Sequence, residues 1–551
     1  MTTHSLTPKL LTVLREGYSF ESFRADALAG LTVAVVALPL SMALAIASGA
    51  SPDKGLVTAV IAGFLISALG GSRTQVGGPT GAFVVVIFNI IAAHGYDGLL
   101  VATVLAGLIL VAAGLLRLGQ LIKFIPHPVI TGFTAGIAVI IASSQVKDFL
   151  GLTMASVPAE FVPKWVAFFA SMGTLDPATL AVGVGSLAVI VALRKVAPRL
   201  PGFLIAIVLA ALAVHLLDLP VDTIGTRFPD IPSGLPAPSL PQVSLAMVQE
   251  VLPSAFTIAF LAGIEALLSA VVADGLAGTR HRSNQELIGQ GVANLGSALF
   301  AGLPATGAIA RTATNIRAGA RTPVAGMMHA VFLLLFVLFG TDLMAYVPMA
   351  ALAAILFLVA WGMSEYERFL VLLRMPNSDR AVLLITFGLT VLVDLTVAIG
   401  VGVTLASLLF MARMAESVAV DISGARDPDL DSEDAAQREE LPEGVEVFRI
   451  TGPFFFGVAG ELLDTLRRLG QRPKVIILRL RLVPLLDASG ARALEEFVSQ
   501  AKLAGVEIVM SGVQPQPMAV LERLDLGART FKVHHAPDFE SALEIARKLA
   551  I

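Results

Sequence analysis

Long apolar stretches separated by short polar connections dominate this chain, and they leave few folds open to it. The hydrocarbon core of a bilayer is about 30 Å thick, so a helix needs roughly 20 apolar residues to cross it. Fourteen candidate stretches, bounded by charge clusters or Gly/Pro pairs, precede residue 415. In two groups of seven, they lie near 29–49, 55–69, 79–93, 97–116, 127–146, 177–193 and 201–217, then near 247–273, 285–301, 306–318, 322–341, 345–362, 380–394 and 396–413. We therefore expect an all-α, polytopic membrane domain with 14 transmembrane segments.

Charged residues divide the chain into two parts of different composition. Residues 1–415 are about 10% charged, whereas residues 416–551 are about 28% charged, which is typical of a soluble domain. Neither part is basic enough to suggest nucleic acid as a partner. The absence of cysteine excludes disulfides, thiolate catalysis and Cys-ligated metal. The expected divisions are a cytoplasmic N-terminal segment (1–26), a transmembrane domain (27–415), a flexible acidic linker (416–443) and a small α/β domain (444–551).

Lysine and arginine alternate between the expected loops in a way that orients the chain. With the N-terminus inside, sixteen of them fall on the cytoplasmic side and four outside, as the positive-inside rule requires. Residues 1–26 are polar and the first apolar stretch is too long for a signal-peptide core, so we expect no cleavable signal. The prediction is a multi-pass membrane protein with both termini in the cytoplasm.

Two of the apolar stretches, 79–93 and 306–318, are too short to cross and follow helix-breaking residues. Both contain one tripeptide: Thr80-Gly81-Ala82 recurs as Thr306-Gly307-Ala308, each copy third in its group of seven. An odd number of spans per repeat turns the second copy upside down, which gives the 7+7 inverted repeat of secondary transporters. Chance recurrence in an Ala/Gly-rich chain is the alternative, and the matching order, shortness and preceding prolines argue against it.

The two short segments predict an anion site, because in an inverted repeat their N-termini meet near the bilayer midplane. Helix N-termini offer unpaired backbone N–H groups and the positive end of the helix dipole. Glycine and alanine leave those groups uncovered, and Thr80 and Thr306 add hydroxyl donors. Arg311 could supply full positive charge, although a structural interhelical or snorkelling arginine is the alternative.

Glu265 is the acid before residue 415 that lies in the middle of an apolar stretch. An ionised acid there costs several kcal/mol, so a functional role is the default interpretation. The same repeat offset places Glu265 opposite Pro39 of the first stretch, where we expect a local helix distortion. Glu265 could take up a proton together with the anion, and Ser269, one turn on, shares its face. A permanently protonated or Arg311-paired structural glutamate is the alternative.

The sequence gives little support for ATP-driven transport or for a metal site. No Gly-rich phosphate loop follows a strand, which argues against ATP drive, and the histidines before residue 415 do not cluster as a metal site requires. We therefore expect a protein that is not an enzyme and has no cofactor or metal, with a proton rather than Na⁺ as the coupling ion.

The C-terminal part alternates strands and helices after the acidic linker. Expected strands are Val445–Ile450, Val475–Leu480 and Val506–Met510, and expected helices are Ala459–Leu469, Gly490–Ala504 and Pro517–Leu524. Asp487 and Ser489 stand at the start of one helix, where helix capping alone would explain them.

Several motifs together resemble the sulfate permease (SulP) family of anion transporters over essentially the whole chain. They are Ala37-Leu-Pro-Leu40, Gly77-Gly-Pro-Thr80, Gly263-Ile-Glu265 with Asp274-Gly275, Asn284 to Gly291, and Arg311 through Ala325. The C-terminal domain resembles the STAS domains of anti-sigma-factor antagonists. Three stretches are similar to the DauA type, bacterial carriers of C4-dicarboxylates: Ala43-Leu-Ala-Ile-Ala-Ser-Gly49, Lys147-Asp-Phe-Leu-Gly-Leu152 and Val359-Ala-Trp-Gly-Met-Ser-Glu365.

The resemblance implies UraA-like core and gate domains, elevator-like alternating access and a homodimer in a bacterial inner membrane. It also places Glu265 and Ser269, the candidates for proton coupling, facing the substrate. It places the substrate among Pro39, Leu40, Ser41, Met42, Gly78, Pro79, Thr80, Gly81, Ala82, Phe83, Thr306, Gly307, Ala308, Ile309 and Arg311. Phosphorylated STAS domains carry Asp-Ser-Ser-Gly. Here Ala488 replaces the first serine and Ser489 matches the candidate phosphoacceptor. A cytosolic partner of the STAS domain, such as acyl carrier protein, is also implied.

The leading hypothesis is proton-coupled uptake of a C4-dicarboxylate such as succinate or fumarate. Sulfate, bicarbonate or chloride carriage by the same family is the alternative, because an N–H cradle recognises charge more than carbon skeleton. An anion channel is a third option. A different class of function is a membrane-tethered sensor or scaffold with the STAS domain as its output, whose phenotype would vanish on deletion of 440–551 while transport continued.

Overall fold

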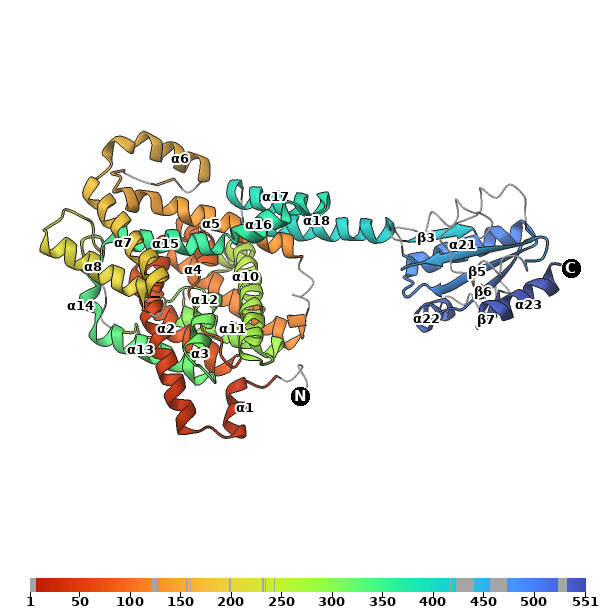
Figure 1. Cartoon of the computed structure of the whole chain (residues 1–551), viewed down its shortest axis with the longest axis horizontal. Helices are drawn as coiled ribbons and strands as arrows, with labels where there is room; N and C mark the ends of the chain where they lie inside the picture. Colours follow the sequence, from red (N-terminus) through yellow and green to blue (C-terminus); the bar gives the residue numbers. More distant parts are fainter. Residues whose placement is uncertain are drawn as a thin grey trace. The chain divides into compact units, whose positions relative to one another are not determined.

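The structure, a computed structural model, describes residues 6–120, 126–154, 157–158, 160–197, 200–229, 232, 234–241, 243–393, 395–416, 418–422, 441–455, 473–523 and 533–551. The chain divides into two compact units, residues 1–404 and 405–551. The first is helical and the second contains a five-stranded sheet (Figure 1).

The first half of the helical unit follows the expected spans. Its elements are α1 (Lys9–Glu16), α2 (Phe20–Ala47), α3 (Pro52–Leu69), β1 (Gly77–Gly78), the 3₁₀ turn η1 (Gly81–Phe83), α4 (Val84–Leu115), α5 (His127–Leu150), α6 (Phe161–Ala170), η3 (Met172–Thr174), α7 (Pro177–Val196), α8 (Gly202–Leu216) and α9 (Ile224–Arg227). The third and fourth expected spans join in α4, which bends at Gly95, where φ is 69°.

The second half repeats this order. Its elements are α10 (Leu245–Ala277), α11 (Ser283–Leu299), β2 (Thr306–Gly307), α12 (Ile309–Arg317), α13 (Val324–Phe339), α14 (Thr341–Met344), α15 (Met349–Met363), α16 (Tyr366–Leu372), α17 (Asn377–Leu392) and α18 (Leu395–Glu416). Each of the fourteen expected spans thus corresponds to a helix or to one arm of α4. Within the described residues, eight helices are long and apolar enough to cross a membrane.

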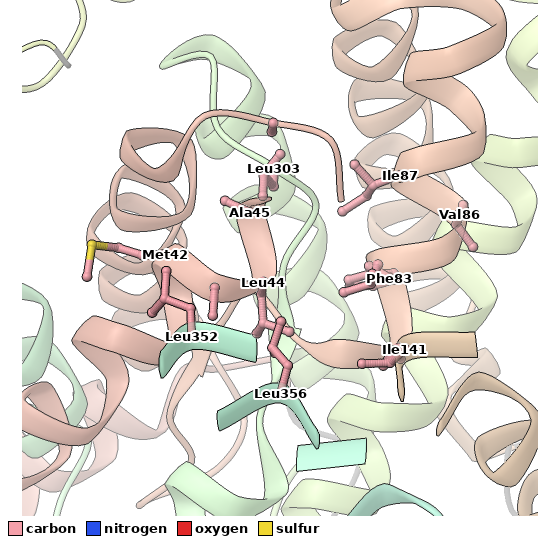
Figure 2. Close-up of a cluster of buried hydrophobic side chains, with 14 of the residues drawn as sticks. Met42, Leu44, Ala45, Phe83, Val86, Ile87, Ile141, Leu303, Leu352 and Leu356 are labelled. Atoms are coloured by element: carbon pink, nitrogen blue, oxygen red, sulfur yellow. The ribbon is translucent and has the colours of Figure 1, made fainter. Parts of the chain in front are cut away.

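Helices of the two repeats interleave in two groups. In one group α3 and α4 pack against α11, α4 against α10, and α2 against α12 and α13. In the other α5 packs against α15 and α17, and α7 against α8 and α15. The largest cluster of buried apolar side chains spans both groups (Figure 2). In this cluster Phe83 lies beside Ile87 and Ile141, and Leu44 near Leu356.

The second unit is an α/β domain with strand order β3-β4-β5-β6-β7. The strands are β3 (Ala419–Ile422), β4 (Val445–Thr451), β5 (Val475–Leu482), β6 (Glu507–Ser511) and β7 (His534–Ala536), and the helices are α21 (Ala488–Leu503), α22 (Pro515–Arg523) and α23 (Phe539–Leu549). β4 to β7 run parallel, whereas β3 is antiparallel to β4. Alternate residues of the strands pack toward α21 on one face and α23 on the other.

Two expectations for this domain need correction. Residues 419–422 fall in the predicted linker 416–443 but form β3, because pairing with β4 satisfies their backbone groups despite the acidic surroundings. β7 and α23 were not expected. The predicted helix Ala459–Leu469 lies outside the described residues, as do linker positions 423–440.

Candidate anion site

The two interrupted segments meet as the repeat predicts. β1 and β2 pair antiparallel, Gly77 opposite Gly307 and Gly78 opposite Thr306. Flanking hydrogen bonds extend the pairing: the Ala308 N–H donates to the Val76 carbonyl at 2.9 Å. The N-termini of η1 and α12 are therefore held next to each other by backbone contacts between the repeats.

Glycine is required where the two segments cross. A Cβ atom on Gly307 would lie 1.6 Å from Nε2 of Gln75, and one on Gly78 would lie 2.4 Å from Nη1 of Arg311. Gly78 also has φ of 150°, which side-chain-bearing residues rarely adopt. The repeated glycines thus permit the close approach of the two backbones.

Both helix ends lack a side-chain cap. Within the described residues, no backbone or side-chain acceptor takes the N–H groups of Gly81 and Ala82 at η1, nor those of Ile309, Ala310 and Arg311 at α12. Unpaired N–H groups at adjacent helix N-termini, each with a positive dipole end, form an anion-binding arrangement. The structure thus brings the predicted N–H cradle together.

Arg311 reaches across this cradle from the second repeat into the first. The side chain is 2% exposed. Its Nη2 donates to the Pro79 carbonyl at 2.9 Å and to the Ser41 hydroxyl at 3.4 Å. Nε and Nη1 are buried without a partner in the described part of the chain. Arg311 is therefore interhelical, as the structural alternative predicted. Its Nε and Nη1 groups stay unpaired, which is costly for a buried charge.

Glu265 of α10 contacts the cradle through Thr80. The Thr80 hydroxyl donates to Oε2 of Glu265 at 2.8 Å, and both residues are partly accessible. Among the described residues no ion pair joins Glu265 to Arg311, so the alternative of an Arg311-paired structural glutamate is not what the structure contains. The acid lies at the edge of the anion site with a hydroxyl as its partner.

Two predicted polar groups point elsewhere. The Thr306 hydroxyl donates to the Ala262 carbonyl at 2.8 Å, so it is no free donor to an anion. Ser269 is fully buried, and its hydroxyl lies 3.1 Å from that of Thr312. Both therefore fasten α10 to the interrupted segment of its own repeat, and neither faces the accessible side of the site that Glu265 borders.

The residues of α2 form the wall behind Arg311. α2 continues through Pro39 as one helix, so the expected distortion does not interrupt it. Ser41 is buried and contacts Arg311, whereas Leu40 is partly accessible. Met42 packs in the apolar cluster near Leu352 of α15 (Figure 2). Of these four, Ser41 is the one joined to the cradle by a hydrogen bond.

Apolar residues of the second helix group close the cradle from the opposite side. A Cβ on Gly81 would lie 2.5 Å from the sulfur of Met363 and 3.3 Å from Cδ1 of Ile141. Phe83 is fully buried in the same region (Figure 2). Phe83 thus contributes packing between the groups, and Met363 and Ile141 approach Gly81 directly.

A polar stripe on α11 was missed by the sequence interpretation. Glu286 is fully buried and accepts the N–H groups of Gly71 at 2.7 Å and Ser72 at 3.1 Å. Asn294 donates to the Ala305 carbonyl at 2.8 Å and accepts its N–H at 2.9 Å. These bonds fix the loops before β1 and β2. The signal was present as polar residues three or four apart in an apolar segment: Glu286, Gln290, Asn294 and Ser297.

In the second unit, the candidate phosphoacceptor lies on the surface. Ser489 is exposed in the first turn of α21, and Asp487 caps that helix by accepting the Gly490 N–H at 2.7 Å. Capping therefore accounts for Asp487, whereas phosphorylation of Ser489 stays a prediction.

Sequence comparison matches each of the two units to a known protein family. Residues 23–386 match the sulfate permease family, and residues 438–541 match the STAS domain. The chain belongs to the sulfate permease family. It is a multi-pass membrane protein and an anion transporter of that family, with a C-terminal STAS domain; its relatives are transporters, not enzymes.

Its similarity to individual family members extends over nearly the whole length. The chain is 41% identical to the putative sulfate transporter YvdB of Bacillus subtilis, over 94% of this chain and 98% of that protein. It is 33% identical to the bicarbonate transporter BicA of Picosynechococcus, over 93% and 92%. The structure of SLC26A9 matches with a TM-score of 0.86 at 18% identity, covering 98% of this chain and 93% of that one, which supports the fold alone.

Proposed function

We propose that this protein is a secondary active transporter that couples uptake of a small anion to a proton taken up by Glu265. The observation that carries the proposal is the hydrogen bond from Thr80 to Glu265, since Thr80 immediately precedes the unpaired N–H groups of η1. An anion in the cradle and a charged Glu265 repel each other, so anion binding favours the protonated acid and protonation favours the anion.

Uptake by purified protein in proteoliposomes tests this coupling. An inward pH gradient should accelerate anion accumulation by the wild-type protein. Glu265→Gln should remove that acceleration yet retain anion binding, because the amide cannot carry the charge that the proton neutralises. Glu250→Gln is the matched control, since Glu250 is an exposed acid of the same helix. Unchanged pH dependence in Glu265→Gln would exclude Glu265 from coupling.

For the substrate, the cradle favours an oxyanion that accepts several N–H groups and the two free nitrogens of Arg311. The DauA-like stretches support a C4-dicarboxylate such as succinate or fumarate. The relationship to BicA favours bicarbonate as a second candidate, and the one to YvdB favours sulfate. Thermal stabilisation of the purified protein by succinate, fumarate, bicarbonate, sulfate and chloride ranks them; stabilisation by sulfate alone would refute the dicarboxylate proposal.

Access to Glu265 runs along one side of α10. Accessible residues recur every three or four positions from Glu265 to the helix end that we assign to the cytoplasm: Leu268, Val271, Val272 and Gly275. Because the chain has no cysteine, every thiol is an introduced one. Leu268→Cys should react with a polar thiol reagent and be protected by substrate, whereas the buried Ser269→Cys should not react. Equal labelling of the two would refute this access route.

The remaining predictions complete the proposal. The two helix groups would be the core and gate domains of an elevator-like homodimer in a bacterial inner membrane, with both termini cytoplasmic and a proton rather than Na⁺ as the coupling ion. The STAS domain would dock a cytosolic protein such as acyl carrier protein.

A further inference from the structure

A cavity of about 930 Å³ lies between the two helix groups, away from the anion cradle. Its walls come from α2 and α12 on one side and from the end of α7 and the start of α8 on the other. α2 contacts both α12 and α8, which places the cavity along its first half. By the positive-inside count, this half of α2 belongs to the cytoplasmic leaflet.

Two arginines from opposite walls line this cavity. Arg194 is in the last turn of α7 and lies over the ring of Phe203, 5.3 Å from its centroid. Arg317 is the last residue of α12 and is exposed. Neither has an acidic partner within the described ranges. The cavity therefore presents two cationic groups that have no counter-charge among the described residues.

The remaining walls are largely apolar. Leu28 is 56% exposed and Leu31 is 43% exposed on α2, and Val35, Val36 and Ile190 continue the same surface. The two lining threonine hydroxyls do not compete for an anion, because Thr32 and Thr314 each donate to a carbonyl of their own helix. An apolar wall below a pair of arginines matches a ligand that has both an acyl chain and an anionic head.

We propose that this cavity binds one anionic phospholipid of the cytoplasmic leaflet. The phosphate lies between Arg194 and Arg317, and an acyl chain covers Leu28, Leu31 and Val35 on α2. Basic pockets between transmembrane helices on the cytoplasmic side are a recurrent way to bind such head groups. A small hydrated anion would satisfy the arginines but leave the apolar wall uncovered, so the lipid fits the cavity better.

The position of this lipid gives it a consequence for transport. α12 carries three of the unpaired N–H groups and Arg311, whereas α7 and α8 belong to the other helix group. A phosphate held by Arg317 and Arg194 therefore links α12, which carries part of the cradle, to α7 of the other helix group. In the proposed mechanism α12 moves past that group. Lipid occupancy favours the relative position of the groups in which both arginines reach one phosphate.

The test measures lipid retention by the purified full-length protein in native mass spectrometry. Phosphatidylglycerol should be retained as one molecule per chain, and phosphatidylcholine should not. Each arginine contributes about fivefold in affinity, so Arg194→Gln with Arg317→Gln should weaken retention about 25-fold. The control is Lys195→Gln with Arg374→Gln, which removes two charges expected on the same side that do not line the cavity.

Each outcome decides the proposal. Loss of retention in the arginine pair but not in the control supports it. Equal retention in both pairs overturns it, because the lipid would then bind elsewhere. Competition by inorganic phosphate at millimolar concentration also overturns it, since the cavity would then be a site for a soluble anion. Anion uptake is not needed for this readout, so failure of the proposed transport function would be distinguishable.

Discussion

The two interrupted helices occupy equivalent places in the repeats, yet they contribute different chemistry to the same site. The first is preceded by Thr80, whose hydroxyl donates to the Glu265 side chain. The second is preceded by Thr306, whose hydroxyl donates to the Ala262 carbonyl, and it contains Arg311. The repeat supplies the N–H groups twice, whereas the titratable acid and the fixed charge each occur once.

In the proposed mechanism this difference separates recognition from coupling. Arg311 would act on the anion directly through its two unpaired nitrogens, while Glu265 would act through Thr80 at the edge of the cradle. Substitutions on the second helix should therefore change affinity, and substitutions around the first should change pH dependence. The affinity of an Arg311 variant and the pH profile of a Thr80 variant test this division directly.

The largest effect is expected for Arg311→Gln. The change removes the charge from the cradle, and hydrogen bonds to charged groups contribute about 1.5–3 kcal/mol each, so kcat/KM for uptake should fall about 100-fold or more. A melting curve checks that the variant remains folded. Arg374→Gln, a control at an exposed arginine, should leave kcat/KM for uptake unchanged. Normal affinity in Arg311→Gln would assign recognition to the backbone alone.

Gly307→Ala should be the next largest change, and it should act on stability. Its Cβ would displace the Gln75 amide, which donates to the Ala266 carbonyl at 3.2 Å, and leaving a buried polar group unpaired costs about 1–3 kcal/mol. Gly81→Ala is the matched variant in the first repeat, where the nearest atom belongs to the flexible Met363 side chain. Thermal unfolding in detergent compares them; a larger loss in Gly81→Ala would contradict the packing argument.

A smaller pair of changes compares the threonines. Thr80→Val should alter the pH profile of uptake, because the free energy of protonating a carboxylate depends on its hydrogen-bond donors. Thr306→Val should lower stability by about 1 kcal/mol and leave the profile unchanged, since its hydroxyl serves a backbone carbonyl. Uptake measured between pH 5 and about 8 in proteoliposomes separates the two, and identical profiles would remove Thr80 from coupling.

The smallest effect is expected at the N-terminus of α7, which the side chain of Asp176 caps. Asp176 accepts hydrogen bonds from the Thr179 hydroxyl, the Thr179 N–H and the Ala178 N–H, which lower its pKa. Its contribution should be complete above the unfolded-state pKa of about 3.9 and vanish as pH falls through the lower native value. Asp176→Ala should cost about 1 kcal/mol at neutral pH. If the melting difference from wild type does not shrink in acid, the cap is not responsible.

Much of this site could be predicted from order and spacing. The repeated Thr-Gly-Ala, the shortness of both segments and the mid-span acid placed Thr80, Arg311 and Glu265 in one region, because inverted topology forces the short helices to meet. The directions of individual side chains could not be predicted. Ser269 is one turn from Glu265, yet it is buried against Thr312, since a modest rotation of α10 decides which of the two faces the accessible side.

Tertiary contacts explain why β3 and the role of Glu286 were not predicted. We assigned residues 419–422 to the linker because the acidic composition around them is typical of a solvent-exposed segment. Composition does not reveal strand pairing, and β4 is the strand with which these residues pair. The polar spacing on α11 is visible in the sequence, but the partners of Glu286, the backbone N–H groups of Gly71 and Ser72, lie more than two hundred residues away and cannot be identified from that spacing.

The four residues of β1 and β2 limit how this transporter can move. Their ladder, with the Ala308 N–H bonded to the Val76 carbonyl, joins the two interrupted segments through main-chain hydrogen bonds. Pulling the segments apart would break these bonds in surroundings that offer no replacement. In the proposed elevator-like mechanism, substrate release has to leave the ladder intact, and the relative movement takes place at the apolar surface around Ile141 and Met363, where contacts are non-directional and can be exchanged at little cost.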